Sequence, residues 1–186
     1  MRIIAGLAKG RRISAPPGEG VRPTGDRVRE ALFSSLQPLL PGAHVLDLYA
    51  GSGALGLEAI SRGAAHATLV ERDPRTLAVL RANVEAVGLP GVAVLSQDVA
   101  SALVSALPGA PFDLVFADPP YRTSGTEIDR LLVTLLGQLA PGATVVVERA
   151  RRDPAPAWPA ELVAHEPRAY GATVLHRAER VPDGLA

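Results

Sequence analysis

Cysteine is absent from the 186-residue sequence, and lysine occurs only once, at Lys9. A chain without cysteine can form neither a disulfide framework nor a thiolate metal site, and we predict no bound metal. Because Lys9 is the only lysine, nearly every positive charge is a guanidinium group. The planar guanidinium suits contacts with phosphates and stacking on nucleobases.

Long apolar runs are missing as well. No stretch approaches the roughly 20 apolar residues that a membrane-spanning helix requires. The N-terminal residues Met1-Arg2-Ile3-Ile4 do not resemble a secretory signal. We therefore expect a cytoplasmic protein without a membrane partner. The chain is 47% hydrophobic, enough for one domain with a substantial core, and we expect a monomer.

Positive charge is concentrated near the N-terminus, although the net charge of the chain is zero. Residues 1–30 contain seven lysine and arginine residues against three acidic residues. Such a segment indicates either contact with a polyanion such as RNA or an ordinary solvated surface. Since the apolar pattern that builds a sheet begins later, we expect this segment to serve RNA rather than the core. The candidate RNA-binding residues are Lys9, Arg11, Arg12 and Arg22.

Glycine and proline divide the first part of the chain. Residues 2–14 predict a short β-hairpin, and residues 15–25 predict a connector. Apolar residues then recur at helical spacing from Asp26 to about Leu40. We place domain boundaries accordingly: a basic hairpin and connector at 1–25, the main domain at 26–180 and a tail at 181–186.

From residue 44 onward, short β-forming runs alternate with helical segments. The alternation predicts an α/β fold with a Rossmann-like, doubly wound and mostly parallel sheet. Two further runs, at 161–166 and 172–178, are expected to pair as an antiparallel edge and bring the sheet to seven strands. The other expected strands are 44–49, 67–71, 92–95, 112–117 and 144–148, and the expected helices are 54–62, 73–87, 99–106 and 126–139.

A glycine-rich turn follows the first of these strands. Gly51 and Gly53 permit a tight turn and the close approach of a ligand. Glu71 ends the next strand, where a carboxylate can accept both hydroxyls of an adenosine ribose. With Gly56, the spacing also matches the dinucleotide fingerprint, so NAD and S-adenosylmethionine both fit. Asp47, an added acid in the first strand, favours S-adenosylmethionine.

Asp98 follows the third strand and could accept a hydrogen bond from an adenine amine. An equally simple interpretation is that Asp47 and Asp98 only cap helices or turns. The ordered combination of these acids with the motif that follows the fourth strand favours a role in function.

The tetrapeptide Asp118-Pro119-Pro120-Tyr121 directly follows the apolar run 112–117. The two prolines force an extended turn that cannot continue into a helix. In open α/β sheets, ligands bind at the carboxyl ends of the strands, where this turn is expected. An acid, a rigid carbonyl and an aromatic ring at such a position suit methyl transfer to a planar exocyclic amine.

With these segments in this order, the chain resembles class I S-adenosylmethionine-dependent methyltransferases that modify amino groups. It is most similar to the bacterial family that methylates the N2 amine of guanine in 16S ribosomal RNA. The resemblance covers residues 1 to about 150, and its most specific part is the segment RPTGDRVREALF at 22–33. It implies S-adenosylmethionine as cofactor and 16S ribosomal RNA, naked or within the 30S particle, as partner.

On this basis we assign three residues to catalysis. The Asp118 carboxylate and the Pro119 carbonyl accept the two hydrogens of the target amine, and Tyr121 stacks on the base. The expected cofactor contacts come from the glycine turn, the acids at the strand ends and the start of the first helix. These residues are Asp47, Tyr49, Gly51, Ser52, Gly53, Glu71 and Asp98, with Thr24 and Arg27 closing over the methionine end.

Several other functions remain open at this point. The same chemistry could methylate adenine N6 or a protein amide. An NAD-dependent oxidoreductase would explain the glycine turn but would leave Asp118 to Tyr121 unused. A non-catalytic RNA-binding module would function without Asp118.

Overall fold

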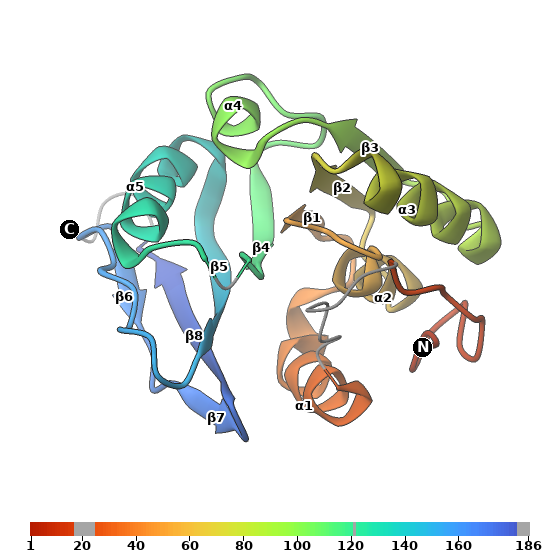
Figure 1. Ribbon diagram of the computed structural model, residues 1–186, viewed down its shortest axis with the longest axis horizontal. Coiled ribbons are helices and arrows are strands. Elements are labelled where there is room, and N and C mark those ends of the chain that lie inside the picture. Colours follow the sequence, from red (N-terminus) through yellow and green to blue (C-terminus); the bar gives the residue numbers. More distant parts are fainter. Residues whose placement is uncertain (17–24, 121, 182–186) are drawn as a thin grey trace.

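The computed structural model describes residues 1–16, 25–120 and 122–181. In this part of the chain, eight strands form one sheet in the order β3-β2-β1-β4-β5-β8-β6, and β7 pairs with β8 (Figure 1). β1 to β5 are parallel, while β8 runs antiparallel to β5, β6 and β7. The strands are β1 (His44–Leu48), β2 (His66–Glu71), β3 (Val92–Ser96), β4 (Phe112–Ala117), β5 (Leu139–Ala150), β6 (Leu162–Ala164), β7 (Arg168–Tyr170) and β8 (Thr173–Arg180).

The predicted doubly wound, mostly parallel sheet is confirmed, as is its antiparallel edge. The predicted count of seven strands is wrong by one, because β7 forms a short hairpin with β8. Its turn begins at Gly171, which has a φ of 60°. With three residues that are mostly exposed, β7 has no apolar alternation from which it could be predicted.

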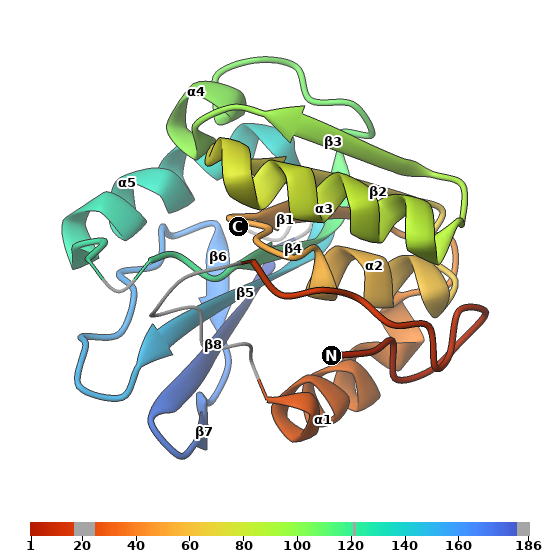
Figure 2. The same cartoon turned by 45° about the vertical axis from the view of Figure 1, so that its right-hand side comes forward.

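Helices cover both faces of the sheet (Figures 1 and 2). α1, α2 and α3 pack on the face to which Leu114 and Phe116 of β4 contribute. α4 and α5 pack on the face to which Val115 and Ala117 contribute, as the alternation of side chains along a strand requires. None of the helices in the described residues is long and apolar enough to span a membrane. The helices are α1 (Asp26–Leu36), α2 (Ala54–Ser61), α3 (Pro74–Val87), α4 (Val99–Leu103) and α5 (Gly125–Leu135), with 3-10 turns at Gln37–Leu39 and Leu136–Gln138.

α3 shows how local signals set the ends of a helix. The Asp73 side chain accepts a hydrogen bond from the backbone N–H of Thr76 at 2.8 Å, and Pro74 occupies the first helical position. Gly88 closes the helix in the left-handed conformation, with a φ of 57°. The predicted helix at 73–87 is confirmed, with Asp73 as its N-cap and Val87 as its last residue.

The N-terminal segment, residues 1–16, is part of the core. It folds back through a single antiparallel bridge between Arg2 and Arg12, in place of the two strands that the predicted hairpin requires. Ile3, Ala8 and Ile13 are buried in the same cluster as α1, α2 and α3. The expectation that this segment does not contribute to the core is therefore wrong. No local pattern indicates the contribution, because the three buried side chains are too widely spaced to form a periodic pattern. RNA binding by the segment stays a prediction.

Polar contacts with α2 hold the N-terminal segment in place. The buried Glu58 carboxylate accepts hydrogen bonds from the backbone N–H groups of Ile4 at 2.7 Å and Ala5 at 3.0 Å. The Ser61 hydroxyl accepts from the N–H of Ala8. At Gly6, with a φ of 83°, a β-carbon would lie 1.8 Å from the Ser61 carbonyl oxygen, so only glycine permits this approach.

We predict that Glu58→Ala lowers the free energy of unfolding by about 3–5 kcal/mol. The change removes the acceptor of two backbone N–H groups and the partner of Arg62, whose Nε lies 2.7 Å from the carboxylate. Urea denaturation measures the effect. Glu85→Ala, on the exposed side of α3, is the matched control and should stay within about 0.5 kcal/mol of the wild type. A loss below 1 kcal/mol for Glu58→Ala would mean that apolar contacts alone hold the segment.

Candidate active site

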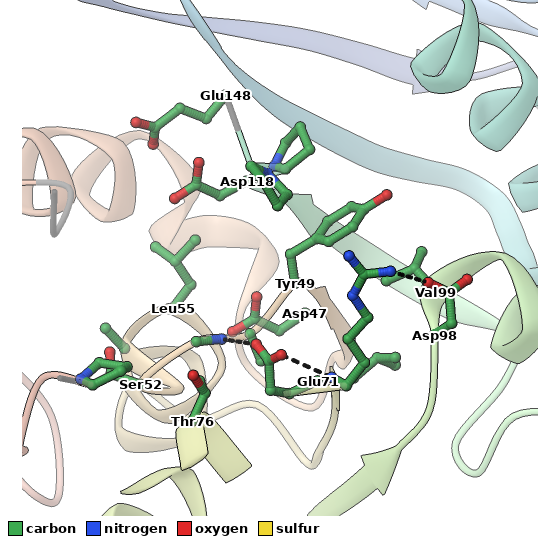
Figure 3. A pocket seen from close by; sticks show the side chains of 18 of the residues that line it. Asp47, Tyr49, Ser52, Leu55, Glu71, Thr76, Asp98, Val99, Asp118 and Glu148 are labelled. Carbon is green, nitrogen blue, oxygen red and sulfur yellow. Dashed lines mark hydrogen bonds and ion pairs between the residues drawn. The ribbon is translucent and has the colours of Figure 1, made fainter. Parts of the chain in front are cut away.

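The carboxyl ends of the five parallel strands surround a cleft of about 530 Å³. β1 lies between β2 and β4, so the chain continues to one side of β1 through β2 and β3 and to the other through β4 and β5. Such a switch in direction leaves a crevice above the sheet, where ligands bind. The side chains that line the cleft include Asp47, Tyr49, Ser52, Glu71, Asp98, Asp118 and Glu148 (Figure 3).

The turn between β1 and α2 has a strained backbone. Tyr49 adopts a φ of 61°, a left-handed conformation that is rare for a bulky residue and costs on the order of 1–3 kcal/mol. Gly51 and Gly53 follow with φ values of 57° and 78°. At Gly56, a β-carbon would lie 2.1 Å from the Leu69 side chain, so this glycine brings α2 close to β2. The three glycines thus serve a tight turn and close helix packing.

Glu71 fixes this turn to the end of β2. Its carboxylate accepts hydrogen bonds from the backbone N–H groups of Gly51 at 3.0 Å, Arg72 at 2.7 Å and Asp73 at 2.9 Å. A carboxylate offers about four acceptor positions, so Glu71 retains acceptor capacity towards the cleft that it lines. The predicted contact of Glu71 with the ribose hydroxyls stays a prediction.

Asp47 is a buried acid at the floor of the cleft. It accepts a hydrogen bond from the backbone N–H of Gly56 in the first turn of α2, at 2.9 Å. Burial, with a smaller contribution from the charge of Glu71, raises the pKa of Asp47 to about 7, against the opposing effect of that hydrogen bond. Asp47 thus bonds to the first turn of α2, as the capping alternative expects, and it also lines the cleft, so the two roles do not exclude one another.

Asp98 likewise has two roles. It is the N-cap of α4, accepting a hydrogen bond from the N–H of Ala100 at 3.0 Å, and it forms an ion pair with Arg72 at 3.0 Å. Both partners of the ion pair line the cleft. The Tyr49 ring lies nearby (Figure 3), and burial together with the charge of Asp98 raises the pKa of Tyr49 to about 12. Its hydroxyl therefore remains protonated at neutral pH.

Asp118 and Pro119 follow β4 and line the cleft, and Figure 3 shows Asp118 on the same side of the cleft as Tyr49. Burial raises the pKa of Asp118 well above its ordinary value, and the charges of Glu148 and Asp47 raise it further. Beyond the turn, the N–H of Thr123 donates to the Pro120 carbonyl at 2.8 Å. The buried Arg149 donates to the Thr123 carbonyl at 3.1 Å, so contacts from β5 hold this loop.

A family model described as "Conserved hypothetical protein 95" matches residues 1–179. The chain belongs to this family. It is 39% identical over 184 residues to the Ribosomal RNA small subunit methyltransferase D of Escherichia coli strain K12, a match that covers 99% of this chain and 92% of the relative. It is also similar to the solved structure of yhhF, a candidate methyltransferase from Escherichia coli, with a TM-score of 0.85 and 37% identity over 98% of this chain and 99% of that one.

The fold extends to more distant proteins. SMU.776, a candidate methyltransferase whose structure contains S-adenosylhomocysteine, has a TM-score of 0.68 and 15% identity over 81% of this chain and 49% of that one. The predicted class I methyltransferase fold and family are confirmed, as are the predictions of an enzyme and of S-adenosylmethionine as its cofactor. The oxidoreductase alternative is thereby excluded.

Most of the residues predicted to take part in catalysis or cofactor binding line the cleft. Asp47, Tyr49, Gly51, Ser52, Glu71, Asp98, Asp118 and Pro119 line it. Gly53 is buried behind the turn, and Arg27 is exposed on α1 and is not one of the described residues that line the cleft. Tyr121, Thr24 and Arg22 lie outside the described residues. Within the described part, no cluster of three or more histidine and acidic side chains is arranged to hold a metal ion.

Arg29 and Glu148 line the cleft but do not follow from the sequence reasoning above. Arg29 is almost fully buried and donates to the Arg2 carbonyl at 2.5 Å and to Asp26 at 3.1 Å. Its spacing to Phe33 and Leu36 puts it on the buried face of α1, a position that an apolar residue normally occupies. Glu148 ends the predicted strand 144–148. Glu71 is selected because it is an acid at the end of a predicted strand, and the same criterion would have selected Glu148.

We predict that Asp47→Asn changes how stability depends on pH. With a pKa of about 7 in the folded state against 3.8 in the unfolded state, Asp47 holds a proton between pH 4 and 7 that the unfolded chain has lost. The free energy of unfolding of the wild type therefore falls as pH rises through this window, by at most about 1.4 kcal/mol per pH unit.

Asparagine keeps the acceptor for Gly56 but carries no charge. The variant should gain stability relative to the wild type between pH 5 and pH 8, measured by urea denaturation at both values. Parallel stability curves for the two proteins would contradict the raised pKa of Asp47.

Proposed function

We propose that this enzyme transfers the methyl group of S-adenosylmethionine to the N2 amine of a guanine in 16S ribosomal RNA. The observation that carries the proposal is one cleft that unites Asp118 and Pro119 with the adenosine-binding set of the glycine turn, Glu71 and Asp98. The name of the Escherichia coli relative, Ribosomal RNA small subunit methyltransferase D, supports the class of substrate. We further propose that the enzyme acts as a monomer in the cytoplasm.

The charges of the cleft support a cationic cofactor. Five acidic side chains line it, against three arginines; the acidic residues are Asp47, Glu71, Asp98, Asp118 and Glu148. In S-adenosylmethionine the sulfur is a positively charged sulfonium, and the positive charge passes towards the amine nitrogen during transfer. Asp118, which follows β4 in this cleft, is placed to stabilise the charge as it reaches the amine nitrogen. A pyrophosphate would instead need the N–H groups at the start of α2, where the N–H of Gly56 is already bonded to Asp47.

The acceptors at the turn suit the amine itself. The lone pair of guanine N2 is delocalised into the ring, so the nitrogen is a weak nucleophile. The Asp118 carboxylate and the Pro119 carbonyl accept one amine hydrogen each, which fixes the nitrogen and directs it towards the methyl carbon. The amine proton becomes acidic once the new N–C bond forms, and Asp118 is placed to accept it. We assign to Tyr121 stacking on the base, worth about 1–3 kcal/mol.

The direct test is the transfer of radiolabelled methyl groups to purified 16S RNA and to 30S particles, followed by analysis of the labelled nucleosides. We expect label in N2-methylguanosine. Comparison of the two substrates decides between naked RNA and the assembled particle. Label in N6-methyladenosine or in protein would contradict the proposed substrate but not the methyltransferase activity.

We predict that Asp118→Ala lowers the transfer rate by about 100–1,000-fold, because one preorganised acceptor at the developing charge is lost. Cofactor affinity, measured by calorimetry, should stay within a few-fold of the wild type. Because the pKa of Asp118 is raised, the wild-type rate should also fall as pH decreases and the carboxylate takes up a proton. Near-normal turnover of Asp118→Ala would refute the assignment.

RNA binding by the N-terminal segment is tested at Lys9 and Arg12, which are both exposed. The double reversal Lys9→Glu, Arg12→Glu should weaken RNA binding and flatten its salt dependence, as phosphate contacts are lost. Arg11 is unsuitable, because its guanidinium donates to the Val87 carbonyl at the end of α3. Arg130→Glu is the control, because α5 packs on the opposite face of the sheet; this variant should bind RNA as the wild type does. If the double reversal and the wild type bound RNA with equal affinity across a salt series, the basic residues of this segment would be an ordinary solvated surface.

A further inference from the structure

Glu148 stands beside Asp118 at the edge of the cleft. Ala117 of β4 pairs with Val147 of β5, so the residues that follow them, Asp118 and Glu148, lie next to one another. Both line the cleft, and Figure 3 shows their side chains pointing in the same direction. The Thr173 hydroxyl of β8 donates to Glu148 Oε1 at 3.3 Å and helps to orient the side chain.

The two acidic side chains are close enough to influence one another. The charge of Glu148 raises the pKa of Asp118, in addition to the larger effect of burial. Asp118 and Pro119 already provide one acceptor for each hydrogen of the target amine. A carboxylate has about four acceptor positions, so Glu148 can provide a further acceptor close to the amine, on the side of Asp118.

The substrate offers one more donor at this place. In guanine, the N2 amine is flanked by N1–H, so the two neighbouring positions both donate hydrogen bonds. In adenine, the N6 amine is flanked by the lone pair of N1, which a carboxylate repels. An acceptor beside the group that holds the amine therefore distinguishes the two purines.

We propose that Glu148 accepts a hydrogen bond from N1–H of the target guanine and so selects guanine over adenine. The inference rests on the proposed guanine-N2 function and adds to it the residue that determines specificity. In this role, Glu148 contacts the substrate base and takes no part in the chemical step. That step still forms the bond from N2 to the methyl carbon and breaks the bond from the sulfur to that carbon.

The test uses 2-aminopurine, which keeps the exocyclic amine at C2 but has an unprotonated N1. RNA or reconstituted particles carry either guanine or 2-aminopurine at the position that the wild-type enzyme methylates. We expect the wild type to prefer guanine, in kcat/KM, by about 10–100-fold, since a hydrogen bond to a charged group is replaced by a repulsion. Glu148→Gln should narrow this ratio to within a few-fold, because its amide can also donate to an unprotonated N1.

Two controls complete the experiment. Glu166→Gln, at an exposed position between β6 and β7, should keep the wild-type ratio. Cofactor binding to Glu148→Gln, measured by calorimetry, should stay within about threefold of the wild type. The loss of O6 in 2-aminopurine affects every variant alike, so the change in ratio between wild type and Glu148→Gln isolates the contact at N1.

The outcomes separate this inference from the proposed function. An unchanged preference in Glu148→Gln, with guanine still methylated by the wild type, would overturn the role of Glu148 only. A large loss of cofactor affinity in this variant would assign Glu148 to the cofactor instead and would also overturn it. Absence of guanine methylation by the wild type would refute the proposed function itself.

Discussion

The pairing of β1 with β2 on one side and β4 on the other is the constraint on which the site depends. The chain runs to one side of β1 through β2 and β3 and then to the other through β4 and β5, and this switch leaves a crevice above the carboxyl end of β1. Tyr49 and the glycine turn enter this crevice from β1, Glu71 from β2 and Asp118 from β4. The hydrogen bond from Gly51 to Glu71 joins two of these strand ends directly. A different strand order would separate the acids from the turn.

The cleft concentrates features that are unfavourable for folding. Asp47 and Asp118 have raised pKa values because they are buried, and Tyr49 has a left-handed backbone conformation. The core formed by α1, α2 and α3 on one face and by α4 and α5 on the other provides the stability that tolerates them. Strain and buried charge of this kind are typical of functional sites. They agree with a cleft prepared for a cationic cofactor and for an amine on which positive charge develops.

The N-terminal segment contacts two of the helices that border the cleft, α2 and α1. Its backbone is bonded to Glu58 and Ser61 of α2, and α2 begins at the glycine turn. The carbonyl of Arg2 accepts a hydrogen bond from Arg29, which lines the cleft. Lys9 and Arg12 are exposed on the same segment. A segment that binds RNA and is also packed in the core would hold the RNA at a fixed position relative to the site of transfer.

The sequence alone determined the features that depend on near neighbours in the chain. The ends of α3 follow from Asp73, Pro74 and Gly88, and the two turns that line the cleft follow from glycine and proline, because these residues determine which local backbone conformations are allowed. Tertiary structure alone decided the environment of Arg29, the approach of Glu148 to Asp118 and the burial of Ile3. These depend on contacts between residues distant in sequence, such as the 53 positions that separate Ala5 from Glu58. Such contacts exist only after the sheet has formed and the helices have packed against it, and no local pattern specifies them.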